Sequence, residues 1–146
     1  MTTPPASFPP ETPAFDSAPT LDDLERLAHE AFAEIPEALR RHVVDVVFRI
    51  DDFAPADVLG DLGLDNPFDL MGLYHGVPLG EKSVMASAAD VDIIFLYRRA
   101  ILDYWCESGE SLPHIIRHVL IHEIGHHFGF SDAAMAALEG GVPEDA

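Results

Sequence analysis

Apolar positions recur at helical spacing close to the beginning of the chain. After Thr20 they follow one helical face, formed by Leu21, Leu24, Leu27, Ala28 and Ala31. Thr20 offers its hydroxyl as an N-cap, and the acidic residues behind it suit the positive end of a helix dipole. The pattern predicts a helix from Thr20 to about Ile35. Pro36 can begin one further turn up to Arg41, because a first-turn residue has no intrahelical donor to lose.

Three later segments carry the pattern of β-strands. Residues 43–50 are dense in β-branched side chains and place alternate apolar residues on one face, and residues 91–98 form a second clear strand. Residues 70–76 predict a third strand that is weakened by Gly72. A glycine inside a strand indicates a sheet edge or a close approach of another backbone. Between the strands predicted over residues 43–50 and 70–76, residues 55–63 predict a loop or short helix.

The longest helical pattern runs from Leu112 to Phe128. Ser111, with Pro113 just inside the segment, is a helix start signal, and Gly129 is a stop signal. Apolar side chains cover most of this helix, and they are Ile116, Leu120, Ile121, Ile124 and Phe128. A helix that is apolar on most sides is expected inside the molecule.

This buried helix carries the sequence His122-Glu123-Ile124-Gly125-His126. His122 and His126 lie one turn apart on one face, so both imidazoles can reach a single metal ion. Glu123 lies about 100° around the helix from His122, which places its carboxylate beside the ion rather than on it. This spacing is typical of a zinc site in which the glutamate is the general base.

A third ligand is expected after the helix, because zinc in a catalytic site takes three protein ligands and the helix supplies two. Gly129 can adopt the left-handed conformation that turns the chain back under the metal. Asp132 is then well placed to be the third ligand. The alternative role for Asp132 is the N-cap of a short helix over residues 133–138.

Two other histidines of this segment are not expected to bind the metal. His118 lies one turn before His122, but three ligands from one helix would strain a tetrahedral site. We therefore expect His118 either behind the metal ligands or at the rim of the site. His127 points to the back of the helix, where we expect it to bond a backbone carbonyl.

Charge and composition narrow the class of protein. The chain has 26 acidic residues against 8 Lys plus Arg, a formal charge of −18, and would repel phosphate backbones. We therefore expect no nucleic acid and no membrane partner. The single cysteine, Cys106, cannot form an internal disulfide and is expected to be incidental, and the N-terminus resembles no secretory signal. We expect a cytoplasmic protein.

The composition also predicts the domain organisation. Residues 1–19 contain six prolines, which block helices and sheet ladders, and are expected to form a flexible tail. Residues 20–140 are expected to fold as a single domain, since 48% of the chain is hydrophobic, and residues 141–146 as a disordered end.

Several segments together resemble the compact zincin-like metallopeptidase family of bacteria, once classed as a domain of unknown function. They are residues 72–79, residues 94–99, and residues 122–129 with Ser131 and Asp132. The last of these looks like the metzincin motif HExxHxxGxxH with aspartate in place of its final histidine. The resemblance implies a minimal α+β zincin, in which a small mixed sheet packs against the active-site helix. It also implies zinc held by His122, His126 and Asp132.

Larger metzincins continue into a C-terminal subdomain with a methionine turn, and few residues follow Asp132 here. Met135 could approximate that turn, but a core methionine is favoured.

The predicted function is hydrolysis of peptide or protein substrates. Zinc polarises the peptide carbonyl and lowers the pKa of its water, while Glu123 takes the proton and passes it to the leaving amine. Tyr74 or Tyr97 could stabilise the oxyanion. The alternative is a non-catalytic zinc-binding module for protein interaction. A purely structural zinc site is disfavoured because it usually has four protein ligands, often cysteines. A metal-dependent nuclease is disfavoured by the charge.

Overall fold

The computed structural model describes residues 17–43, 45–76 and 91–140. The elements in chain order are α1 (Leu21–Glu34), α2 (Glu37–Arg40), β1 (Val46–Asp51), α3 (Ala56–Asp61), η1 (Pro67–Asp69), β2 (Gly72–His75), β3 (Asp92–Tyr97), α4 (Arg98–Ser108), α5 (Leu112–His127) and α6 (Asp132–Gly140). Helices and a small sheet together confirm the α+β prediction. The predicted tails lie outside the described residues, except for residues 17–19.

The three strands form one mixed sheet in the order β1-β3-β2. β1 runs parallel to β3, and β2 runs antiparallel to it. β2 is thus an edge strand among the described residues, as its glycine indicated. The predicted start of β1 at Val43 is wrong, because the N–H of Val43 donates to the carbonyl of Arg40 and continues the turn after α2.

The N-terminal helix begins as its sequence predicts. The hydroxyl of Thr20 accepts the N–H of Asp23 at 3.1 Å, and the carboxylate of Asp23 accepts the N–H of Thr20 at 2.8 Å. This reciprocal pair is a capping box. The N–H of Thr20 lowers the pKa of Asp23 because it stabilises the charged carboxylate.

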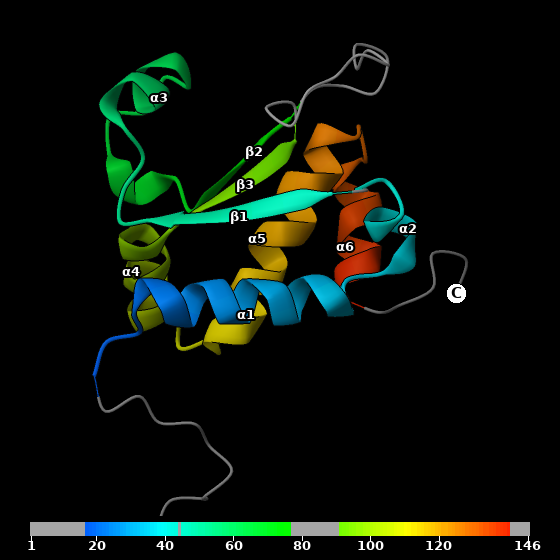
Figure 1. Cartoon of the computed structure of the whole chain (residues 1–146), viewed down its shortest axis with the longest axis horizontal. Coiled ribbons are helices and arrows are strands. Elements are labelled where there is room, and N and C mark those ends of the chain that lie inside the picture. The colour runs from blue at the N-terminus through cyan, green and yellow to red at the C-terminus, as the bar shows by residue number, and fades with distance from the viewer. Residues whose placement is uncertain (1–16, 44, 77–90, 141–146) are drawn as a thin grey trace, which may run out of the picture.

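The main core lies between one face of the sheet and the helices. α1 packs on β1 and on α5, and α5 packs on β2 as well as on α4 and α6. Figure 1 shows α1 running along β1, with α5 crossing behind it. The sheet face toward these helices presents Phe48, Ile94, Leu96 and Tyr74, all buried. α5 is therefore the central helix of the fold, as its apolar pattern predicted.

Gly72 is required where β2 meets α5. A Cβ on Gly72 would lie 2.6 Å from Cγ1 of Val119 and 3.1 Å from the carbonyl oxygen of Phe95. The glycine therefore lets the edge strand lie directly against the central helix, which is the close backbone approach that its position in a strand indicated.

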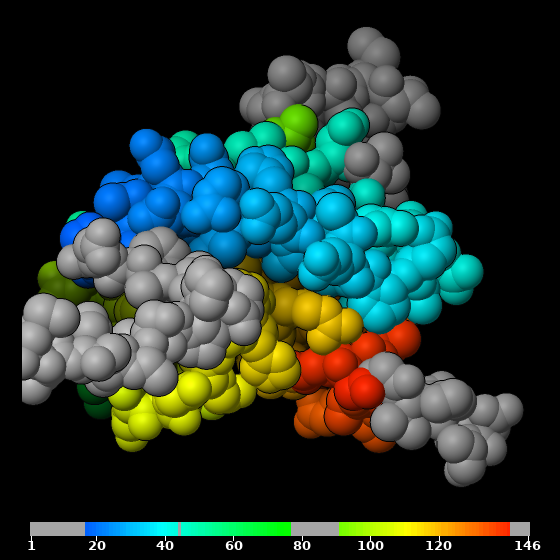
Figure 2. Space-filling view, turned by 90° about the horizontal axis from the view of Figure 1, so that it is seen from below, coloured from blue at the N-terminus to red at the C-terminus, as the bar shows by residue number. Residues whose placement is uncertain are grey.

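No helix in the described ranges is both long and apolar enough to span a bilayer. Figure 2 shows another side of the molecule, where the yellow-orange part of α5 is visible between α1 and the red α6. α5 consequently has neighbours on several sides, and α6 is one of them.

Candidate metal centre

Three histidines of α5 face two carboxylates of α6. His118, His122 and His126 follow one another at intervals of four residues, so they form a row along one side of α5. α6 returns beside this row in the opposite direction, because its first residue, Asp132, contacts His126 while Glu139 contacts the two earlier histidines.

Gly129 makes the return of the chain possible. Its φ of 81° is left-handed, as the sequence predicts. The N–H of Phe130 donates to the carbonyl of Gly125 at 2.8 Å, and that of Gly129 to the carbonyl of His126 at 3.2 Å. These two bonds form a Schellman motif, which ends α5 and reverses the chain.

The hydroxyl of Ser131 caps the next helix. It accepts the N–H of Ala134 at 3.0 Å. The capping role that was the alternative for Asp132 therefore falls on the residue before it. The side chain of Asp132 is 91% exposed and remains available to a ligand.

Close packing of Met135 on α5 sets the position of α6. A Cβ on Gly125 would lie only 2.2 Å from Sδ of Met135, so the two helices approach at a point that tolerates no side chain on α5. Met135 is fully buried. It is a core methionine, as favoured by the sequence, and it fixes the helix that carries both carboxylates.

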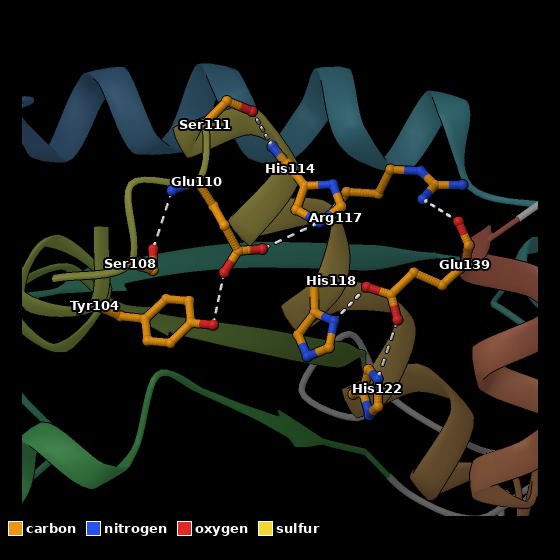
Figure 3. Close-up of polar contacts among 9 residues, drawn as sticks. All are labelled: Tyr104, Ser108, Glu110, Ser111, His114, Arg117, His118, His122 and Glu139. Atoms are coloured by element: carbon orange, nitrogen blue, oxygen red, sulfur yellow. Dashed lines mark hydrogen bonds and ion pairs between the residues drawn. The ribbon is translucent and has the colours of Figure 1, made fainter. Parts of the chain in front are cut away.

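The contacts divide the histidine row into two groups. Nε2 of His126 lies 3.4 Å from Oδ1 of Asp132, while Nε2 of His122 lies 3.3 Å from Oε2 of Glu139. Nδ1 of His118 contacts the other oxygen of Glu139 (Figure 3). In the described parts of the chain, the one group of three whose ligand atoms all lie within 4.8 Å is His118, His122 and Glu139.

The structure thus joins His126 to Asp132 but places His122 against a residue that the sequence analysis missed. Glu139 follows Asp132 by seven residues, almost two helical turns, and so shares its face of α6. This spacing in the sequence could have identified Glu139 as a second carboxylate on that face. Arg117 donates to the backbone carbonyl of Glu139 at 3.1 Å and ties this end of α6 to α5. Burial raises the pKa of Glu139, but His118 and His122 outweigh it and leave the pKa below its usual value.

The donor set suits zinc. Imidazole nitrogens and a carboxylate oxygen are common zinc ligands, and two ligands about 2.0–2.1 Å from a tetrahedral ion lie about 3.3 Å apart. The His122 to Glu139 and His126 to Asp132 distances, 3.3 and 3.4 Å, both match this spacing. His126 and Asp132 form one close pair, while the ring centroids of His122 and His126 lie 5.9 Å apart.

Glu123 lies beside the histidine row and is held from the sheet. Its Oε1 accepts the N–H of Tyr74 at 3.2 Å. Burial raises the pKa of Glu123, while the N–H of Tyr74 and the nearby His126 lower it, and the pKa remains above its usual value. With His118 and His122, Glu123 lines a pocket of about 200 Å³ between α5 and residues 69–72.

The two tyrosines named as oxyanion donors are placed differently. The hydroxyl of Tyr74 donates to the buried Asp92, and the Tyr74 ring stacks on His127 with centroids 4.0 Å apart. Burial raises the pKa of Tyr74, and the hydrogen bond to Asp92 and its negative charge raise it further. Tyr97 is buried, which raises its pKa, and Glu123 adds to the effect. The phenol of Tyr74 is thus directed at Asp92, and His127 serves to pack α5 on β2.

Comparison with known families gives a match over most of the chain. Residues 43–142 match the family described as zincin-like metallopeptidase. This span contains the sheet, the HExxH helix and both carboxylates of α6. No curated protein matches the chain. The extent of the family match, together with the mixed sheet packed on the HExxH helix, shows that the chain belongs to the zincin-like metallopeptidase family.

Proposed function

We propose that this chain is a zinc peptidase that hydrolyses peptide bonds with Glu123 as its general base. The observation that carries the proposal is the position of Glu123 in the pocket beside His122, fixed by the backbone of the edge strand. Membership of a metallopeptidase family supports zinc peptidase chemistry in general.

His122, His126 and Asp132 are the proposed zinc ligands, two from α5 and one from the start of α6. When bound, zinc acts as a Lewis acid toward the peptide carbonyl and makes water more acidic. Asp132 can close on the ion because its side chain is exposed and its neighbour Ser131 carries the helix cap. The spacing of the HExxH histidines on α5 and the 3.4 Å distance between His126 and Asp132 support this set.

The remaining steps use residues of the chain. Glu123 accepts a proton from the attacking water and returns it to the leaving amine, so one carboxylate serves both halves of the reaction. The N–H of Tyr74 keeps one oxygen of Glu123 in place, which limits the rotamers of the base. Glu123 itself lines the pocket, so its carboxylate can meet a substrate bound there.

Removal and return of the metal test this function. We expect the zinc-loaded chain to cleave members of a peptide library, detected by mass spectrometry, and to lose cleavage after chelation. Added Zn²⁺ should restore it and Mg²⁺ should not, because Mg²⁺ prefers oxygen ligands. If the chain holds zinc but yields no product, the activity proposal is contradicted and a non-catalytic zinc module is favoured.

A further inference from the structure

Glu139 holds two histidines of α5 at once. One of its oxygens lies 3.3 Å from Nε2 of His122, and the other contacts Nδ1 of His118. Figure 3 shows both rings directed at this carboxylate, while the pair formed by Glu110 and His114 lies further along the helix. The Glu139 side chain is only 16% exposed, so it is built into the α5–α6 interface rather than extended into solvent.

We propose that His118, His122 and Glu139 form a second binding position for a divalent transition-metal cation such as Zn²⁺. This position lies one helical turn from the position formed by His122, His126 and Asp132. It rests on contacts already present between α5 and α6, and does not depend on the proposed peptidase activity.

The donors meet the requirements of such an ion. Two imidazole nitrogens and one carboxylate oxygen form the same set as in many catalytic zinc sites. All three ligand atoms lie within 4.8 Å of one another, and the His122 to Glu139 distance matches a tetrahedral edge of about 3.3 Å. Only two of the ligands come from one helix, which avoids the strain expected for three. His118 and His122 also line the pocket, so a fourth coordination position can face solvent or a ligand.

The backbone around Glu139 supports this geometry. Arg117 holds the carbonyl of Glu139, and Met135, one turn earlier on α6, is locked against Gly125. Both contacts hold the α6 backbone from which the Glu139 side chain projects. Glu139 therefore approaches the histidines from a fixed helix.

His122 belongs to both positions, and Nε2 is the atom directed at Glu139. Because one ring nitrogen binds one ion, Nε2 of His122 can serve only one of the two metal positions at a time. Zinc at His118, His122 and Glu139 would remove a ligand from the HExxH position. The second position therefore competes with the first for metal.

A variant that lacks His126 and Asp132 separates the two metal positions. In His126→Ala/Asp132→Ala, we expect Co²⁺ to bind with about one ion per chain, measured by titration calorimetry and by the visible absorption of tetrahedral Co²⁺. Adding Glu139→Gln should weaken this binding by at least about 100-fold, since even outer partners of metal ligands are worth 10–100-fold. Adding Glu110→Gln instead should leave it unchanged, because Glu110 contacts His114, outside the proposed ligands.

The double variant, with its fold verified by circular dichroism, overturns the proposal if it binds no Co²⁺. Equal affinity with Glu139→Gln and with Glu110→Gln would overturn it as well. Neither result touches the proposed function, which is tested by cleavage and zinc content of the unaltered chain.

Discussion

Glu123→Gln is expected to lower kcat for peptide cleavage by about 10²–10⁴-fold, the usual contribution of a general base. Glutamine has the shape of glutamate, and its amide oxygen can still accept the N–H of Tyr74 that positions Glu123. It cannot take a proton from water. Zinc content should stay the same because Glu123 lies beside the proposed ligands rather than among them.

Kinetics on one cleaved peptide, together with atomic absorption on the same samples, check this prediction. Glu110→Gln is the matched control because it makes the same chemical change at a glutamate that contacts His114 near the start of α5 and Tyr104 of α4, away from the pocket. Full activity in Glu123→Gln would place the base elsewhere. Loss of zinc together with activity would instead give Glu123 a role in metal binding.

Met135→Ala is expected to lower the free energy of unfolding by about 2–5 kcal/mol, the range for truncating a buried methionine. Met135 is fully buried and fills the space that Gly125 leaves on α5. The cavity would loosen α6, which carries Asp132 and Glu139, so metal affinity should fall as well.

Chemical denaturation of the metal-free protein measures the change in stability. The control is Met135→Leu, which nearly conserves volume and should cost less than about 1.5 kcal/mol. A loss below about 1 kcal/mol in Met135→Ala would show that the packing of α6 on α5 does not depend on this side chain.

The sequence predicted the local parts of the site because their signals are local. Ser111 and Gly129 mark the ends of α5, and helical spacing places His122 and His126 on one side. Because glycine can adopt the left-handed conformation, Gly129 also predicted that the chain reverses after α5. Each of these features depends on a few neighbouring residues, which one sequence displays directly.

The role of Glu139 depends on packing and was missed for that reason. Gly129 turns the chain back, but the approach of Glu139 to His122 also requires α6 to lie close against α5, which depends on the contact of Met135 with Gly125. Similarly, Tyr74 was a candidate for the oxyanion, but its hydroxyl meets Asp92 from the neighbouring strand. Spacing along the chain places Glu139 on the same face of α6 as Asp132, but it does not show that this face lies against α5. The partner of the Tyr74 hydroxyl likewise depends on how the strands pair.

Measuring zinc per chain in His122→Ala tests the central claim most directly, because His122 belongs to both proposed metal positions. His114→Ala is the control, since His114 lies on the same helix but contacts Glu110. The account predicts about one zinc per chain in the wild type and in His114→Ala, and almost none in His122→Ala. Wild-type zinc content in a folded His122→Ala protein would contradict it.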